Sequence, residues 1–144
     1  MKITFLGTGT STGVPEIGCK CEVCTSADPR DARLRCSALL SVDDTNILID
    51  CGPDFRQQML RESITDVDAV ILTHQHKDHT GGMDDIRAFN YFRQEAFPIY
   101  AEEYVQESLK MEYSYAFAEF KYPGVPEYKL HTIDENPFTI SKKL

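Results

Sequence analysis

The stretch His74-Gln75-His76-Lys77-Asp78-His79 lies near the middle of the chain and directly follows an apolar run over residues 67–73. It brings three imidazoles and one carboxylate together within six positions. Alternate side chains of an extended segment point to the same side, so His74 and His76 share one side, while Asp78 and His79 lie one turn further on. Imidazole and carboxylate groups are typical ligands of zinc and related ions. The stretch therefore predicts two adjacent metal positions at the end of a strand.

Such a cluster indicates hydrolytic chemistry. A divalent ion bound by these groups can lower the pKa of a bound water from 15.7 to about 7, and two ions roughly 3.5 to 4 Å apart can polarise the oxygens of a phosphoryl group. Phosphodiester hydrolysis fits this arrangement. The ligand types suit zinc, manganese or iron and leave the choice among them open. His131 lies apart from the cluster and is predicted to be an ordinary strand residue.

Three of the five cysteines form a second candidate metal site. They have the spacing Cys19-x-Cys21-x-x-Cys24, directly after Gly18. The odd number of cysteines and the lack of an export signal at the N-terminus argue against a disulfide framework. Three thiolates at this spacing can converge on one ion, which predicts a structural zinc site. The alternative is three reduced thiols on a loop, and zinc normally takes a fourth ligand.

Composition limits the partners that we expect. The 144 residues suit one domain, and their net charge of −8 gives no broad attraction to a phosphate backbone. A small anionic substrate held by metal is favoured over a nucleic acid. The chain has no apolar run of about 18 residues and no n-region followed by an apolar h-region, so we expect no membrane partner and a cytoplasmic location.

Hydrophobic periodicity predicts a mixed α/β (α+β) fold. The expected strands cover residues 2–6, 36–42, 46–50, 68–73, 98–101 and 128–133, with another strand beginning at 138–140. Residues 36–50 read as a hairpin. The expected helices cover residues 54–62, 83–92 and 102–111. The aromatic segment 113–122 fits both states and is left open.

Three blocks of the sequence resemble, in the same order, the metallo-β-lactamase superfamily of metal-dependent hydrolases. The blocks are Ile3-Thr4-Phe5-Leu6-Gly7-Thr8-Gly9, Leu48-Ile49-Asp50-Cys51-Gly52 and Ile71-Leu72-Thr73-His74-Gln75-His76-Lys77-Asp78-His79-Thr80-Gly81-Gly82. The cysteine motif and Gly82-Met83-Asp84-Asp85-Ile86-Arg87 are similar to the subfamily that contains phosphoribosyl cyclic phosphodiesterase, close to ribonuclease Z.

The resemblance implies roles for the residues of the central stretch. His74 and His76 would hold one metal ion, zinc or manganese. Asp78 and His79 would hold the other and would be the catalytic residues. Asp50 would orient the ligand loop without touching the metal, although an aspartate of a simple turn at the end of a strand is an equal alternative.

Two further roles concern residues outside the central stretch. The three cysteines of the motif would hold a separate structural zinc. Arg87 is a candidate for binding the substrate phosphate, and a surface salt bridge is its alternative role.

The superfamily fold is a four-layer αββα sandwich, and its remaining metal ligands come from the C-terminal half. This chain ends at Leu144, before any of them. We therefore expect residues 1–144 to form a single, incomplete domain, the N-terminal part of a longer hydrolase. The inner face of its sheet would be bare, which predicts a homo-oligomer or a covering partner.

The sequence leaves three candidate functions open. The first is metal-dependent hydrolysis of a phosphodiester, in particular a small cyclic ester such as a phosphoribosyl cyclic phosphate. The second is processing of the 3′ end of tRNA, which the acidic composition disfavours. The third is metal binding without catalysis by this chain alone, because half of the ligand set is missing.

Overall fold

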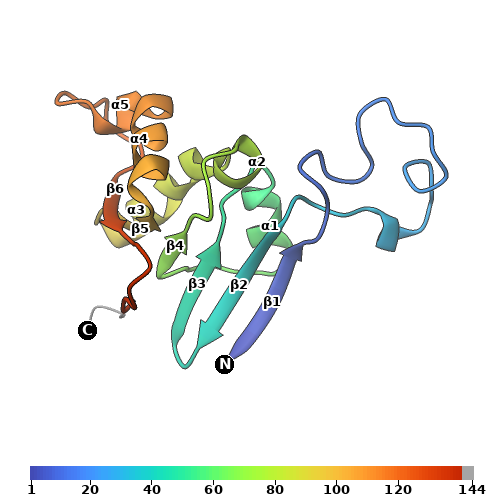
Figure 1. The fold of residues 1–144 in the computed structure, drawn as a ribbon, viewed down its shortest axis with the longest axis horizontal. Helices are drawn as coiled ribbons and strands as arrows, with labels where there is room; N and C mark the ends of the chain where they lie inside the picture. The colour runs from blue at the N-terminus through green and yellow to red at the C-terminus, as the bar shows by residue number, and fades with distance from the viewer. Residues whose placement is uncertain (141–144) are drawn as a thin grey trace.

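A computed structural model describes residues 1–140 and shows one six-stranded sheet with its helices (Figure 1). The strands are β1 (Lys2–Gly7), β2 (Ser37–Val42), β3 (Thr45–Ile49), β4 (Ala69–Ile71), β5 (Phe97–Ala101) and β6 (Tyr128–Thr132). The helices are α1 (Phe55–Arg61), α2 (Lys77–Thr80), α3 (Arg87–Arg93), α4 (Glu103–Glu112) and α5 (Ser114–Phe117), with 3-10 helices η1 (Pro29–Asp31) and η2 (Met83–Ile86).

The strands lie in the order β1-β2-β3-β4-β5-β6, so each strand pairs with its neighbours in sequence. The pairs β1–β2 and β2–β3 are antiparallel, and β3 to β6 are parallel. The predicted hairpin over 36–50 is confirmed, and Asp43 in its turn has a φ of 51°, a left-handed conformation that aspartate tolerates. Each parallel connection after β3 contains a helix, as crossovers between parallel strands require.

Three of the expected elements differ in the structure. The strand expected over 68–73 is shorter, because β4 covers Ala69–Ile71. The helix expected over 83–92 is divided into η2 and α3, because its first turn is wound as a 3-10 helix with a bond from Asp85 N to Gly82 O. The strand expected to begin at 138–140 is wrong, since these residues lie in no strand. Asn136 N donates to Asp134 Oδ1 at 2.8 Å, a turn that ends the extended run and brings Phe138 onto Tyr100. Any continuation over 141–144 lies outside the described residues.

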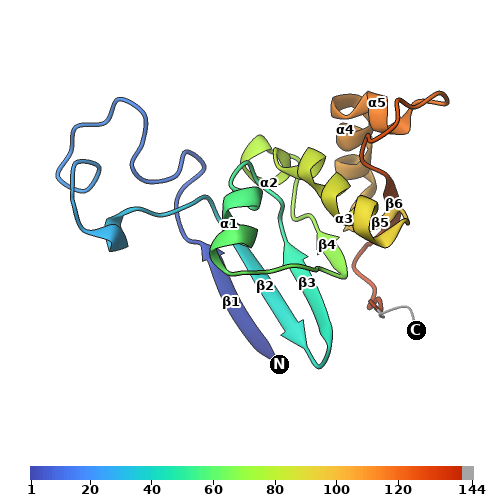
Figure 2. The ribbon, with the colours of Figure 1, turned by 180° about the vertical axis from the view of Figure 1, so that it is seen from behind.

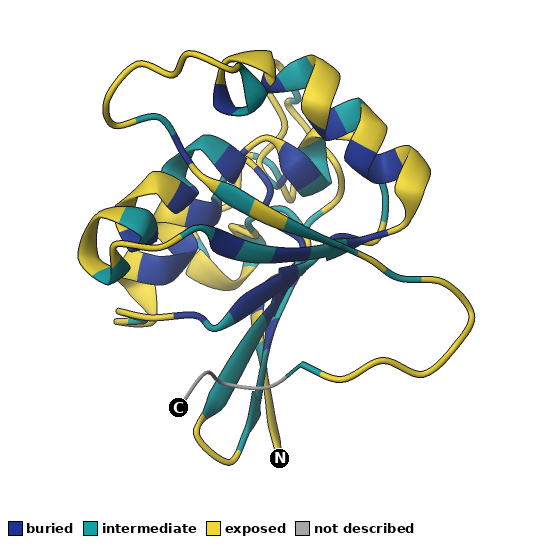
Figure 3. Cartoon of the chain, turned by 90° about the vertical axis from the view of Figure 1, so that its left-hand side faces the viewer, coloured by how far each residue is buried: buried dark blue, intermediate teal, exposed yellow. Residues whose placement is uncertain are grey.

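The core lies between one face of the sheet and the helices. Leu39, Leu48, Val70 and Ile99 are neighbours across β2 to β5, and all four are buried. Helices α1 and α3 lie in front of the sheet when the molecule is seen from behind (Figure 2). Figure 3 shows the buried residues concentrated where helices and strands meet. Among the described residues, every helix is too short or too polar to cross a bilayer.

The opposite face of the sheet is also apolar, and in residues 1–140 no helix covers it. A row of side chains crosses five neighbouring strands on this face through the registered positions Phe5, Ala38, Ile49, Ile71 and Tyr100. The side chain of Phe5, at one end of the row, is 70 % exposed. At the other end of the row, the rings of His131 and Phe138 stack on Tyr100. The face is therefore an apolar surface that needs a cover.

We expect the chain on its own to self-associate through this face, because the row exposes apolar area that water disfavours. Substituting Phe5→Glu at its exposed end should shift the chain toward monomer in sedimentation velocity runs at micromolar concentration. Phe120→Glu is the matched control, since Phe120 is 89 % exposed and lies outside the sheet. A compact monomer of the unsubstituted chain would contradict the expectation.

Candidate metal centre

The predicted ligands lie at the carboxyl end of β4, where parallel strands commonly present ligand-binding residues. Strand β4 ends at Ile71, and a short loop leads from there into α2, which carries Asp78 and His79. His76 is exposed, whereas His74, Asp78 and His79 are half-buried. The centre is thus held by the fold on one side and open to solvent on the other.

The structure brings the four predicted ligands together in two pairs. His74 Nε2 lies 3.2 Å from His76 Nδ1, and Asp78 Oδ2 lies 3.1 Å from His79 Nε2. Two ligand atoms on a tetrahedral zinc, with bonds of about 2.0 Å, are about 3.3 Å apart. The rings of His74 and His79 have centroids 4.0 Å apart, so the two pairs are adjacent. Each pair fits one ion, and the donor set of imidazoles and a carboxylate matches zinc.

Asp50 connects the two pairs, because it contacts His79 directly and reaches His74 through Thr73. Its carboxylate is buried, with Oδ2 2.7 Å from His79 Nδ1. Because a carboxylate accepts, His79 donates through Nδ1 and keeps Nε2 free for a metal. Asp50 itself has a φ of 61°, a left-handed conformation that is uncommon outside glycine and that places its carboxylate under the loop. This contact is the geometry expected of a residue that orients a ligand.

Thr73 extends this network to the other pair, and sequence analysis missed it. Its backbone N donates to Asp50 Oδ1 at 2.8 Å, and its Oγ1 lies 2.9 Å from Asp50 Oδ2 and 3.0 Å from His74 Nδ1. The hydroxyl can donate to the carboxylate and accept from His74 Nδ1, which leaves His74 Nε2 free. The only signal for this role in the sequence is the position of Thr73 directly before the histidines.

The turn between β3 and α1 supports the backbone of α2. Cys51 N donates to His79 O at 2.8 Å, and Gly82 N donates to Cys51 O at 2.9 Å. A Cβ at Gly52 would lie 2.1 Å from Asp78 O, so only glycine permits this approach. Burial raises the pKa of the Cys51 thiol well above its ordinary value, so the thiol stays protonated within this turn.

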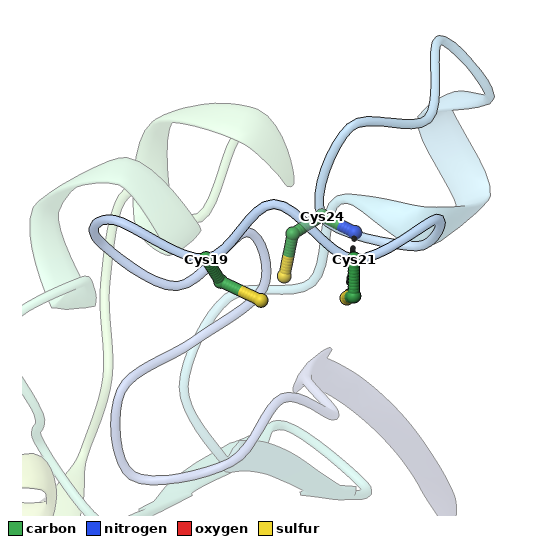
Figure 4. A group of neighbouring side chains, drawn as sticks. All are labelled: Cys19, Cys21 and Cys24. Atoms are coloured by element: carbon green, nitrogen blue, oxygen red, sulfur yellow. Dashed lines mark hydrogen bonds between the residues drawn. The ribbon is translucent and has the colours of Figure 1, made fainter.

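The three predicted zinc cysteines also meet. Figure 4 shows Cys19, Cys21 and Cys24 on one side of their loop, and their Sγ atoms all lie within 4.8 Å of one another. The backbone N–H of Cys24 donates to Cys21 Sγ at 3.5 Å and is the main cause that lowers the pKa of Cys21 to about 7. A thiolate is the form that binds zinc. The group contains three donors among the described residues, so its geometry suits a zinc that takes a further ligand from elsewhere.

The cysteines lie on an excursion, residues 8–36, that projects from the sheet between β1 and β2 (Figures 1 and 2). Its base is closed by isolated bridges that pair Gly9 with Arg35 and Val14 with Arg33. Arg35 Nη1 also forms an ion pair of 2.8 Å with Asp54, the residue before α1. The cysteines thus lie on a different segment from the histidines, and the base of this segment is joined by an ion pair to the turn between β3 and α1.

Arg87, the predicted phosphate contact, begins α3. Its Nη1 lies 3.2 Å from Asp84 Oδ2, and Tyr115 Oη lies 2.5 Å from the other oxygen of that carboxylate. The salt-bridge role is therefore present in the structure. Contact with a substrate phosphate stays a prediction.

Fold and site together define a metallo-β-lactamase-type chain, a class whose members are mostly hydrolases. Residues 45–144 match the model of the β-lactamase superfamily domain, and the chain belongs to that superfamily. The expected fold, the N-terminal portion of the metallo-β-lactamase fold, is confirmed.

Solved structures of similar chains agree with this assignment. A diphosphatase from the PhnP family has a TM-score of 0.86 and 40 % identity, with 96 % of this chain and 52 % of that chain covered. Zn²⁺-bound PqqB from Methylobacterium extorquens has a TM-score of 0.71 and 23 % identity, and covers 92 % of this chain and 46 % of its own. The short form of human tRNase Z has a TM-score of 0.59 and 18 % identity, over 92 % of this chain and 45 % of that chain. The last two show the fold alone.

One curated relative is an octanoyltransferase of Porphyromonas gingivalis. It is 48 % identical over 143 residues, which are 98 % of this chain but 29 % of that protein. The chain thus spans about half the length of the solved structures above and less than a third of this relative. The name of the longer protein therefore assigns no activity to the matched part.

Proposed function

We propose that this chain is the N-terminal part of a metal-dependent hydrolase that cleaves a small phosphodiester, such as a cyclic phosphate ester of the phosphoribosyl type. One observation carries the proposal: two ligand pairs with separations of 3.2 and 3.1 Å lie side by side, and one of their imidazoles is fixed by the buried Asp50. The likeness to a diphosphatase at 40 % identity supports phosphoryl chemistry. A pair of adjacent metal positions suits displacement at phosphorus.

The roles of the residues follow from their contacts. When bound, a pair of zinc or manganese ions would supply a water of lowered pKa. Asp50 holds His79 through Nδ1, and Thr73 holds His74 through Nδ1, so that both imidazoles present Nε2 to the site. His76 is exposed, so a substrate could reach the site from its side. Arg87 would bind the phosphate only after release from Asp84.

We further propose that residues 1–144 form one incomplete domain whose remaining ligands follow Leu144. The bare sheet face and the coverage of about half of the diphosphatase support this. The cysteines would hold a structural zinc completed by the same missing part. A cytoplasmic location is also proposed, because an odd number of cysteines, three of them at the spacing of metal ligands, is typical of a reducing compartment.

Hydrolysis assays on the complete protein test this function. We expect cleavage of cyclic and linear bis-ester phosphates with zinc or manganese, and a loss in kcat/KM of more than about 100-fold in His76→Ala, because a metal ligand should matter more than the residues that support ligands. His131→Ala is the matched control, since His131 stacks on Tyr100 with ring centroids 4.5 Å apart and lies outside the cluster. A loaded protein that is inert toward both ester classes would refute the proposal.

The other two interpretations have less support. Processing of tRNA would need a basic surface, and this chain has a net charge of −8. Metal binding without catalysis would apply to this chain when it is separated from the rest of the domain, because residues 1–140 bring two of the predicted ligands together for each ion. Activity in the complete protein and none in residues 1–144 alone would reconcile that interpretation with the proposal.

A further inference from the structure

Helix α2, which carries two of the four candidate ligands, is too short to be stable by itself. It has four residues, and the side chain of its N-cap His76 makes no capping hydrogen bond. One helical turn is unfavourable in isolation because nucleation costs more than its hydrogen bonds return. The orientation of Asp78 and His79 must therefore come from contacts with the rest of the chain.

One side of α2 is held by the β3–α1 turn, as described above. The other side is held by the junction of α4 and α5, and Figures 1 and 2 show α2 between α1 and α4. Tyr113 Oη donates to Thr80 O at 2.8 Å, and both residues are buried. Carbonyls in the last turn of a helix have no partner within the helix. The hydroxyl of Tyr113 thus satisfies a buried acceptor next to His79.

A second contact joins the same two segments at the start of α2. Lys77 forms an ion pair with Glu112, the last residue of α4, and Lys77 Nζ also lies 5.8 Å from the centre of the Tyr113 ring. The carboxylate of Glu112 is mostly buried, at 21 % exposure. The two ends of α2 are therefore fastened to consecutive residues, Glu112 and Tyr113.

A third contact continues the attachment past α2. Tyr128 Oη donates to Met83 O at 2.9 Å, and the rings of Tyr113 and Tyr128 have centroids 6.4 Å apart. The phenol of Tyr113 is protonated at physiological pH, and burial raises its pKa further, so the hydroxyl is a donor there. The three contacts together join α2 and the residues that follow it to the end of α4 and to β6.

We propose that Glu112 and Tyr113 form a latch that positions α2, so that Asp78 and His79 converge on one metal ion. Both act as positioning residues, because they reach the ligands only through Lys77 and the backbone at Thr80. The inference rests on the metal site proposed above and is independent of which phosphate ester is cleaved. It gives a function to an aromatic segment that the sequence left unassigned.

The test is binding of Co²⁺ to the complete protein with Tyr113→Phe. This change removes one hydroxyl and keeps the ring, so we expect about a tenfold loss of affinity at the Asp78–His79 position. The weak absorption bands of Co²⁺ held by nitrogen and oxygen should also change. The intense thiolate bands from the cysteine site are the internal reference and should keep their wild-type affinity. Tyr104→Phe is the matched control, because Tyr104 is an exposed residue of the same helix, α4.

The outcomes are separable. If Tyr113→Phe lowers thermal stability but binds Co²⁺ at the histidine site with wild-type affinity and spectrum, the latch is overturned and the contact is structural only. If Tyr113→Phe fails to fold, Glu112→Gln replaces it, with a smaller loss at the same position expected and wild-type binding overturning the latch. A wild-type protein that binds Co²⁺ at the histidines but cleaves no phosphate ester would refute the proposed function and leave the latch measurable.

Discussion

Asparagine in place of Asp50 is expected to lower the affinity of the Asp78–His79 position for zinc by about 10- to 100-fold. The amide oxygen can still accept from Thr73 N, at 2.8 Å in the present geometry, so the loop keeps its backbone contact. In the wild type, His79 Nδ1 lies 2.7 Å from the second carboxylate oxygen, Asp50 Oδ2. In the variant the amide nitrogen takes that position, so two donors face each other. The imidazole then loses its acceptor and its fixed orientation.

Elemental analysis and zinc titration of the complete protein measure this effect. Asp43→Asn is the matched control, because Asp43 is exposed in the β2–β3 turn and asparagine tolerates its φ of 51°. The zinc at the cysteines should be retained in both variants. The same occupancy of the histidine site in Asp50→Asn as in the wild type, at zinc concentrations near the wild-type dissociation constant, would contradict the role assigned to Asp50.

Alanine in place of Gly52 should have the largest effect on the fold of the site. Its Cβ would lie 2.1 Å from the backbone oxygen of Asp78, and backbone cannot rotate away as a side chain can. Overpacking of this kind typically costs about 1–3 kcal/mol and occasionally more. We expect the free energy of unfolding to fall by about 3 kcal/mol. Because relief requires α2 to move, zinc at the histidine site should be lost as well.

Urea unfolding together with zinc counting checks this prediction. Gln57→Ala is the control, since Gln57 is an exposed residue of α1, the helix that follows the same turn. A Gly52→Ala protein that keeps both wild-type stability and wild-type zinc content would show that the turn and α2 are not in rigid contact.

The local parts of the structure could be predicted because their signals are local. The hairpin around Asp43 and the helix after Asp54 follow from alternation, helical spacing and turn residues, which act over a few positions. The convergence of the three cysteines and the pairing of His74 with His76 likewise follow from short spacings. Phe138 shows the limit: an apolar residue in an extended segment suggested a strand, but the Asp134 turn decided its position.

The candidate ligands were therefore determined by the sequence itself, since the residue types at 74–79 set which donor groups are available and on which side of the chain they lie. Only the tertiary structure decided what holds them. Asp50 reaches His79 across 29 residues, and Tyr113 reaches Thr80 across 33. Contacts between such distant positions arise from packing of the sheet and helices as a whole, and no local spacing encodes them.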